Sequence, residues 1–312
     1  MTAAGPLVVL AGPTAVGKTQ VAIALCQRFG AEVVSADSVQ IYRGLDIGSA
    51  KPTAQEQAQA PHHLIDVVGP EEVFDAARFV DLADRAIAGI QARQKKVLVA
   101  GGTGLYIKAL LHGLAPAPPV DEKLRQRLRQ RWDQEGAEAM HQKLKQLDAE
   151  AAQRLHPRDR QRVLRALEVC LQTGRSLSSL QNGHGFSKIR YPHVIIGLDR
   201  PRPELNQRIE HRCRQMWDQG LIEEVRGLLA EGVSPGARSL ESLGYRHALA
   251  VLQGQSDPEQ ALSLMARDTK AYAKRQLTWF RGLESIHWHS PEDISAISSR
   301  AEAAWLDPGA KR

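Results

Sequence analysis

A glycine-rich segment near the start of the chain carries the clearest chemical signal. It follows the pattern Gly-x-x-x-x-Gly-Lys-[Ser/Thr] and consists of Gly12, Pro13, Thr14, Ala15, Val16, Gly17, Lys18 and Thr19. In such a loop, backbone N–H groups surround phosphate oxygens, the lysine adds a full positive charge, and the hydroxyl can ligate Mg²⁺. The segment predicts a site for a diphosphate or triphosphate group, with Thr19 as a magnesium ligand.

A nucleoside triphosphatase would also carry an apolar strand that ends in aspartate, which orients Mg²⁺. The strand expected at 97–100 is followed instead by Gly-Gly-Thr-Gly at 101–104, and Asp66 lies inside an expected strand. Conventional ATP hydrolysis is therefore not supported. Asp37 follows the strand expected at 32–36, at the edge where an open α/β sheet binds its ligands. We expect its carboxylate to face the phosphate site.

The elements that must position these residues alternate short apolar runs with helical periodicity over residues 1–115. This alternation is typical of an α/β unit with a mainly parallel sheet. Strands are expected at 7–11, 32–36, 63–68 and 97–100, and helices at 18–28 and 75–93, the latter with a buried face of Phe79, Leu82, Ala86 and Ile90. The glycine-rich loop then joins a strand to a helix, as phosphate binding requires.

A proline-rich run at 115–119 ends this unit and reads as a linker. Residues 116–190 carry amphipathic helix patterns without a strand signal, up to a polar turn expected at 182–185. The chain then returns to the sheet with a strand at 194–198, helices at 203–219, 221–231 and 258–281, a short strand at 286–288, and a helix capped by Ser290 with Pro291 in its first turn. We predict a P-loop NTPase-like α/β core (1–115 and 191–312) with an inserted all-helical domain (116–190).

The positive charge is concentrated in the predicted insertion. The net charge of +6 is 41 Lys+Arg minus 35 Asp+Glu; residues 1–115 hold 10 of each and residues 191–312 hold 16 of each, whereas residues 116–190 hold 15 against 9. This distribution favours a local surface for a polyanion. Arg158, Arg162 and Arg165 have the spacing of one helix face and could follow an RNA backbone; a solvated face is the alternative.

Other protein classes fit the sequence poorly. With 43% hydrophobic and 24% charged residues the composition is that of a globular protein, and the longest apolar runs, such as 7–11, are too short to span a membrane. No basic stretch precedes this run, so a secretory signal is not expected. Cys26, Cys170 and Cys213 lie far apart and are expected to be reduced core thiols. We expect a cytoplasmic monomer that does not bind membranes.

Several segments together resemble the tRNA dimethylallyltransferase family in order and spacing, over nearly the whole chain. The resemblance rests on residues 12–19, 35–42, 46–52, 62–66, 101–106, 159–168, 243–246 and 274–281. Long eukaryotic members of the family carry a C-terminal zinc finger, and this chain ends without one. We therefore expect the bacterial form.

The resemblance implies that the loop binds the diphosphate of dimethylallyl diphosphate with Mg²⁺, and not ATP. The dimethylallyl group would pass to N6 of the adenine immediately 3′ of the anticodon, so that diphosphate is the leaving group and Lys18 offsets its charge. Asp37 would bind the amino group as general base, which suits a poor nucleophile, and Thr103 would lie beside the bridging oxygen. Arg208 and Arg212, one helical turn apart after a predicted strand, would suit a diphosphate clamp or be ordinary solvated arginines.

The resemblance also maps contacts to the tRNA anticodon stem-loop onto this chain. Their positions are Asp37, Ser38, Val39, Gln40, Thr103, Arg125, Gln161, Arg162, Val163, Leu164, Arg165, Glu241, Ser242, Leu243, Gly244, Tyr245, Arg246, Lys274, Arg275, Gln276, Leu277, Thr278, Trp279, Phe280 and Arg281. Glu241 and Ser242 match the family pattern less well than the others.

Three alternatives stay open from the sequence. A small-molecule or nucleotide kinase would share the loop, the sheet and a helical lid, and would bind ATP in the loop. An isopentenyltransferase of the same general kind could act on free adenine nucleotides without tRNA. A P-loop protein that binds RNA without catalysis would keep its role when Asp37 loses its charge.

Overall fold

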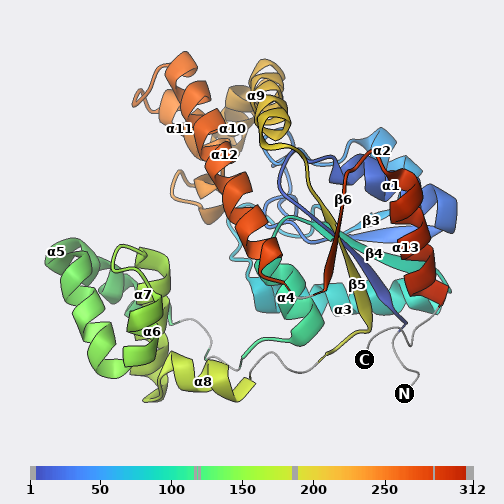
Figure 1. Ribbon diagram of the computed structural model, residues 1–312. Helices are drawn as coiled ribbons and strands as arrows, with labels where there is room; N and C mark the ends of the chain where they lie inside the picture. The colour runs from blue at the N-terminus through green and yellow to red at the C-terminus, as the bar shows by residue number, and fades with distance from the viewer. Residues whose placement is uncertain (1–4, 116–117, 119–120, 185–188, 284, 307–312) are drawn as a thin grey trace. The chain divides into compact units, whose positions relative to one another are not determined.

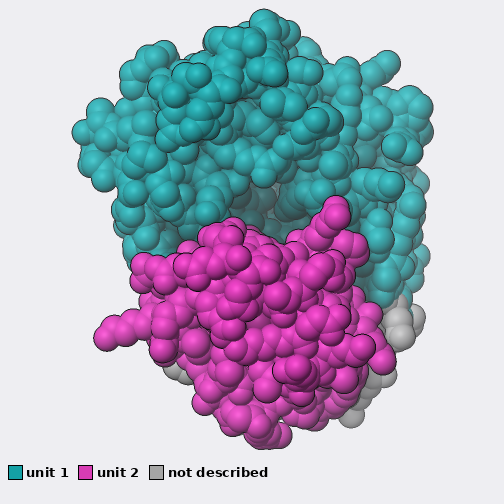
Figure 2. All heavy atoms as spheres, turned by 90° about the vertical axis from the view of Figure 1, so that its left-hand side faces the viewer, with its two compact units in different colours: residues 1–111, 190–312 teal, residues 112–189 magenta. Residues whose placement is uncertain are grey.

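The computed structural model describes residues 5–115, 118, 121–184, 189–283 and 285–306. The chain divides into two compact units: unit 1 contains residues 1–111 and 190–312, and unit 2 contains residues 112–189. Figure 1 labels the elements and Figure 2 colours the two units. Of the proline-rich run expected as a linker, residues 116, 117 and 119 lie outside the described residues.

Unit 1 is built on a six-stranded sheet in the order β3-β2-β4-β1-β5-β6, in which every described strand pair is parallel. The strands are β1 (Leu7–Ala11), β2 (Ala31–Ser35), β3 (His62–His63), β4 (Lys96–Gly101), β5 (His193–Leu198) and β6 (Ile286–His289). All of β1 is buried, as expected for an apolar strand in a sheet covered on both faces. The predicted α/β fold is confirmed.

The helices of unit 1 fall into a group that covers the sheet and a group beyond its carboxyl edge. They are α1 (Lys18–Phe29), α2 (Ala54–Gln59), α3 (Ala76–Ala92), α4 (Gly104–His112), α9 (Arg202–Asp218), α10 (Leu221–Ala230), η1 (Arg238–Glu241), α11 (Tyr245–Leu252), α12 (Pro258–Arg281) and α13 (Ile294–Leu306). α1 packs with α13 on the sheet, and α3 packs on β2 and β4 (Figure 1). Beyond the edge, α12 packs along α9 and α11. Most loops that follow the strands therefore lie near this second group.

Three sequence predictions for unit 1 are wrong in detail. The strand expected at 63–68 ends at His63, because Leu64 and Asp66 adopt φ values of 64° and 57° that extended pairing does not allow. The last helix begins at Ile294 and not after Ser290; the Oδ1 of Asp293 accepts from its first turn. In α3 the buried residues include Ala83 and Ile87 in place of Leu82 and Ala86, a small rotation of the predicted face.

In the part of unit 2 that the structure describes, every regular element is a helix. The unit contains α5 (Glu122–Leu147), α6 (Ala149–Arg154), α7 (Arg160–Thr173) and α8 (Leu177–His184). Asp121, Asp148 and Asp159 cap the first three helices with side-chain acceptors, and Gly136, with φ 81°, interrupts α5. The turn expected at 182–185 is wrong for its first three residues, which continue α8, and Gly185 lies outside the described residues.

The core of unit 2 is apolar and continuous. It consists of Leu128, Met140, Leu144, Ala151, Ala152, Val163, Leu164, Ala166 and Leu167. Elsewhere in the chain Cys26 and Cys213, like Cys170 here, are buried free thiols, which confirms the prediction for them. Across the described parts of both units, every helix is too short or too polar to cross a bilayer.

Candidate active site

The loop between β1 and α1 forms one wall of a cavity of about 810 Å³ in unit 1. Gly17 has a φ of 112° directly before α1, a conformation that favours glycine. A Cβ at Gly12 would lie 2.8 Å from the carbonyl oxygen of Leu198, so this position also needs glycine. The first turn of α1, whose N–H groups have no partners within the helix, lines the cavity. The loop thus has the form of an anion site.

Lys18 reaches back over this loop. Its Nζ donates to the carbonyl oxygens of Gly12 and Pro13 at 2.9 and 2.8 Å. Burial lowers the pKa of Lys18 to about 8; the nearby Arg212 guanidinium also lowers it, and the Asp37 carboxylate acts in the opposite direction. A bound anion would stabilise the charged ammonium of Lys18, as expected for a site that binds anions.

Three arginines that follow β5 contact the carbonyl or hydroxyl oxygens of the loop. Arg208 donates from Nε to Ala15 at 3.0 Å, and Nη1 of Arg212 lies 3.5 Å from the Thr14 hydroxyl. Both predicted clamp residues line the cavity. Arg200, which sequence reasoning missed, donates from Nε to the carbonyl oxygen of Val16 at 2.8 Å. A position directly after a parallel strand was the available signal for it.

Asp37 and Thr103 meet at the ends of β2 and β4. The Oδ1 of Asp37 accepts from the N–H groups of Val39 at 2.8 Å and Gln40 at 3.2 Å, and Asp37 lines the cavity. The Thr103 hydroxyl accepts from the N–H of Ser38 at 3.2 Å. These bonds order the turn after β2, and within the described residues they occupy only one oxygen of the Asp37 carboxylate.

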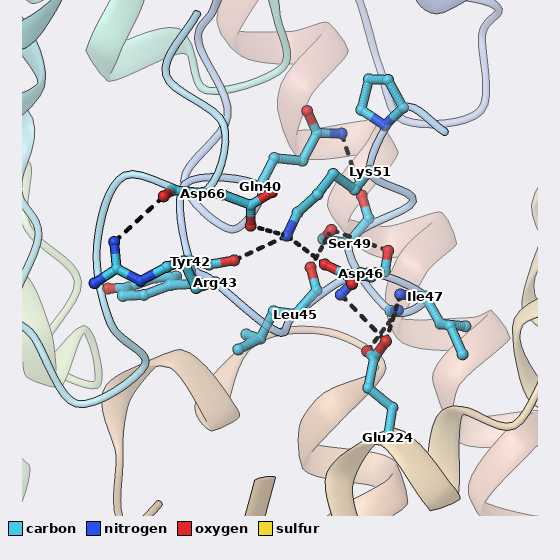
Figure 3. Close-up of polar contacts among 12 residues, drawn as sticks. Gln40, Tyr42, Arg43, Leu45, Asp46, Ile47, Ser49, Lys51, Asp66 and Glu224 are labelled. Atoms are coloured by element: carbon cyan, nitrogen blue, oxygen red, sulfur yellow. Dashed lines mark hydrogen bonds and ion pairs between the residues drawn. The ribbon is translucent and has the colours of Figure 1, made fainter. Parts of the chain in front are cut away.

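The loop that continues from Asp37 is fixed by its own polar side chains (Figure 3). Gln40 donates from Nε2 to the carbonyl oxygens of Ser49 and Ala50 at 3.3 and 3.1 Å. The Nζ of Lys51 donates to the carbonyl oxygen of Tyr42 at 3.0 Å and pairs with the carboxylates of Asp46 and Asp66. The Lys51 side chain is 5% exposed. Asp66 is 44% exposed and pairs with this buried lysine, so it does not belong to a strand.

Glu224, from α10, holds the far end of this loop. Its carboxylate accepts from the backbone N–H groups of Asp46, Ile47 and Gly48 at 3.2, 2.7 and 3.4 Å (Figure 3). The Tyr245 hydroxyl donates to the same carboxylate at 2.6 Å. Sequence reasoning missed both Glu224 and Lys51, because no sequence pattern around either residue indicates which groups its side chain contacts.

The predicted RNA-contacting residues of unit 1 divide by exposure. Exposed side chains are those of Glu241, Arg246, Lys274, Arg275, Thr278, Trp279 and Arg281. Half-buried side chains are those of Asp37, Ser38, Val39, Gln40, Thr103, Ser242, Leu243 and Leu277. Gly244, Tyr245, Gln276 and Phe280 are buried. For Tyr245, Gln276 and Phe280 a side-chain contact with RNA is not available here, because each packs inside unit 1.

The arginine stripe predicted in unit 2 is wrong as a single helix face. Arg158 precedes α7, which begins at Arg160. Arg165 lies 3.2 Å from the Glu168 carboxylate and donates to the carbonyl oxygen of Pro118 at 3.1 Å, and Arg125 lies 3.2 Å from Glu168. Glu168 is 2% exposed, and a buried carboxylate needs such partners.

Arg158, Arg162 and Gln161 remain exposed in unit 2, whereas Val163 and Leu164 belong to its core. Within the described residues, the side chain of Arg162 has a single, distant ion pair, at 3.6 Å, with Asp159. The side chain is 68% exposed, so this pair contributes little and leaves the charge available to a polyanion.

The donor set fits Mg²⁺ through Thr19. Its hydroxyl belongs to a residue that lines the cavity beside Lys18. Within the described residues no group of three or more His, Cys, Asp or Glu side chains could hold a metal ion. One protein hydroxyl together with phosphate oxygens and water suits Mg²⁺, which retains water ligands and often binds through substrate phosphates.

The sequence around this site is similar to that of known proteins. Residues 40–283 match the family described as "IPP transferase". The chain belongs to this family. It is 48% identical over 296 residues to "tRNA dimethylallyltransferase 1" of Trichlorobacter lovleyi, covering 95% of this chain and 97% of the relative. IPP transferase relatives of similar identity include a tRNA dimethylallyltransferase of Geobacter sulfurreducens, 45% identical over 95% of both chains.

Solved structures of IPP transferase relatives are also similar. The tRNA isopentenylpyrophosphate transferase of Bacillus halodurans gives a TM-score of 0.71 at 38% identity and covers 97% of this chain and 98% of its own. A eukaryotic dimethylallyltransferase described as acting on tRNA gives 0.78 at 27% identity, covering 96% of this chain and 78% of its own. The predicted family is confirmed.

The lowered pKa of Lys18 predicts a pH dependence of diphosphate binding. Below pH 8 the ammonium is charged in the free protein, and above it the charge is lost unless the ligand restores it. We expect the ratio of wild-type to Lys18→Ala affinity for inorganic diphosphate to fall by about tenfold between pH 7 and pH 9. Calorimetric titration of both proteins with Mg²⁺ present measures it, and the ratio cancels the ionisation of diphosphate itself. An affinity ratio that is the same at pH 7 and pH 9 would contradict the lowered pKa of Lys18.

Proposed function

We propose that this protein transfers the dimethylallyl group of dimethylallyl diphosphate to N6 of the adenine immediately 3′ of the anticodon in tRNA. The observation that carries the proposal is that Lys18 and Asp37 line one cavity behind a phosphate loop. Membership in a family of prenyl transferases supports the chemistry and leaves the kinase and the non-catalytic alternatives without support. We expect the reaction to take place in the cytoplasm.

In the proposed reaction the bond between C1 of the dimethylallyl group and the bridging oxygen breaks while the bond from N6 to C1 forms. The N6 proton passes to the Asp37 carboxylate. Oδ1 of Asp37 is held by two backbone N–H groups, so the carboxylate is oriented before substrate arrives. Such preorganisation is what makes a side chain effective as a general base.

The leaving group gains negative charge as the bond breaks. Lys18, the N–H groups at the start of α1, and two of the arginines that follow β5, Arg208 and Arg212, are the donors around that charge. A magnesium ion held by Thr19 would neutralise part of the same charge when bound. Thr103 would lie beside the bridging oxygen, at the end of β4. These donors interact more strongly with the transition state than with the bound substrate. Only such a difference in interaction accelerates the reaction.

Contacts to tRNA in both units would offset the cost of removing the adenine from its stack. That cost is a few kcal/mol. The exposed cations on α12, with Arg246, are the candidates in unit 1, and Arg158 and Arg162 are those in unit 2. We expect a protein that acts as a monomer.

One incubation tests the proposal. The protein is incubated with Mg²⁺, dimethylallyl diphosphate and bulk tRNA, and the tRNA is digested and analysed by nucleoside mass spectrometry. The expected product is N6-dimethylallyl adenosine in tRNA. Product on AMP or ADP but not on tRNA would instead support an enzyme for free nucleotides, and tight binding of ATP but not of dimethylallyl diphosphate would overturn the proposal.

Recognition in unit 2 should be separable from the chemistry in unit 1. Replacing Arg158 and Arg162 with glutamine should weaken tRNA binding and reduce the slope of log affinity against log salt by about 0.7 to 0.9 for each phosphate that the protein no longer neutralises. Affinity for dimethylallyl diphosphate should not change. Filter binding over a range of salt measures the slope.

The matched control replaces Arg127 and Arg129 with glutamine. Both arginines are exposed on α5 of the same unit. The control removes equal charge at positions outside the predicted contacts, so its effect on the slope should be smaller. Equal slopes for both double variants would mean that only overall charge attracts tRNA.

A further inference from the structure

The side chain of Gln276 joins two loops of the candidate active site to α12. Its Oε1 accepts from the N–H of Thr14 at 2.9 Å, and its Nε2 donates to the carbonyl oxygen of Gly102 at 2.8 Å. Gln276 is 7% exposed, so water is a poor substitute for either partner. One amide therefore fixes the separation between the phosphate loop and the loop that carries Thr103.

Two glycines allow α12 to come this close. A Cβ at Gly102 would overlap Nε2 of Gln276, and a Cβ at Gly104 would overlap the indole of Trp279. These glycines flank Thr103 in the sequence, and Gln276 and Trp279 lie one turn apart on α12. The helix thus holds the Thr103 loop on both sides of the threonine.

The same stretch of α12 also presents cations to solvent. Lys274 and Arg275 are exposed, and the Arg281 side chain is 63% exposed although it pairs with Asp199 at 2.9 Å. Trp279 is 38% exposed and lies among them. One helix therefore carries both an exposed basic surface and the amide that bridges the two loops.

We propose that Gln276 is a positioning residue for prenyl transfer, which sets the separation of the diphosphate loop and Thr103 and ties both to the helix that engages tRNA. This inference rests on the proposed function. It replaces the tRNA contact that the family resemblance implies for Gln276, because the amide is buried and bonded at both ends. Gln276 acts on the reacting groups only indirectly, through the backbone of Thr14 and the backbone of Gly102.

Two variants test the bridge. Gln276→Leu removes both hydrogen bonds at similar volume, and Gln276→Glu keeps an acceptor for Thr14 but places an acceptor against the Gly102 carbonyl. We expect the single-turnover rate at saturating substrates to fall by about 10²-fold in both, the usual effect of a small misplacement of reacting groups. The dissociation constants for tRNA and inorganic diphosphate should change by less than about threefold.

A readout that does not need activity accompanies the rate. In Gln276→Leu the Thr14 N–H loses its partner, so we expect faster hydrogen exchange in peptides that cover residues 12–17. The control is Gln260→Glu on the exposed start of the same helix, where Oε1 accepts from the Ser256 hydroxyl at 3.1 Å and a carboxylate can do the same. It should match the wild type in rate and exchange.

Two results would overturn the proposal. If the variants bind tRNA more weakly but react at the wild-type rate when saturated, Gln276 is an RNA contact. If rate and exchange are both unchanged, the bridge positions nothing. Should Gln276→Leu fail to fold, the single-turnover rate and the tRNA affinity of Gln276→Glu decide between these outcomes, because this variant loses only the bond to Gly102. A wild-type protein that does not prenylate tRNA would contradict the proposed function, whereas the exchange measurement would still test the bridge.

Discussion

Replacing Asp37 with asparagine should reduce prenyl transfer by roughly 10²-fold or more while leaving substrate binding nearly unchanged. The reason is local. The bonds that orient Asp37 run from the N–H groups of Val39 and Gln40 to Oδ1, and an asparagine Oδ1 can accept both. The turn after β2 should therefore keep its shape. What the variant loses is the ability to take the N6 proton.

The measurement is a single-turnover rate with tRNA and dimethylallyl diphosphate both saturating, together with the dissociation constant of each. Asp75→Asn is the matched control: Asp75 caps α3 by accepting from the N–H of Arg78 at 2.9 Å, and asparagine caps helices equally well. The same chemical change away from the cavity should leave the rate intact. A wild-type rate for Asp37→Asn would mean that another group, or water, accepts the proton.

Much of this site could be predicted from the sequence because its determinants are local. A phosphate loop needs a buried strand, glycines at fixed positions and a following helix, and all three are contiguous in residues 7–29. Asp37 followed from the rule that ligands bind where parallel strands end. The spacing of Arg208 and Arg212 placed both on one side of α9, and both line the cavity.

The contacts that hold the site together could not be predicted, because their partners are far apart in the chain. Gln276 and Thr14 are separated by 262 residues, and Glu224 and the N–H of Asp46 by 178. A motif names a residue type at a position but does not state which way the side chain points. Gln276 shares a motif with exposed cations, yet it faces inward.

Charge patterns failed for a related reason. Spacing grouped Arg165 with Arg158 and Arg162, but the helix begins only at Arg160, and a buried carboxylate, Glu168, offsets part of the charge of Arg165. The unpaired positive charge of a segment depends on which acidic residues fold against it. The prediction for Asp66 failed for a different reason. The apolar run around it predicts a strand, but the run does not reveal that Asp66 adopts a left-handed backbone conformation and pairs with Lys51.

Replacing Lys18 with alanine should slow prenyl transfer by more than it weakens diphosphate binding. Dimethylallyl diphosphate already carries negative charge when it binds, and the breaking bond adds the charge of the bridging oxygen. A buried ammonium therefore interacts more strongly with the transition state than with the bound substrate. The loss of one such donor typically raises the barrier by about 3 kcal/mol, or roughly 10²-fold in rate.

The contacts of Lys18 in the free protein sharpen this expectation. Its Nζ donates to the carbonyl oxygens of Gly12 and Pro13, and these bonds hold it over the loop before the ligand arrives, so little reorganisation precedes the reaction. Lys95→Ala, in the exposed turn before β4, removes the same charge away from the cavity and should leave both quantities unchanged. If Lys18→Ala lowers the single-turnover rate and the diphosphate affinity by equal factors, Lys18 only holds the substrate, and the leaving group must be stabilised by the helix N-terminus, the arginines of α9 and Mg²⁺.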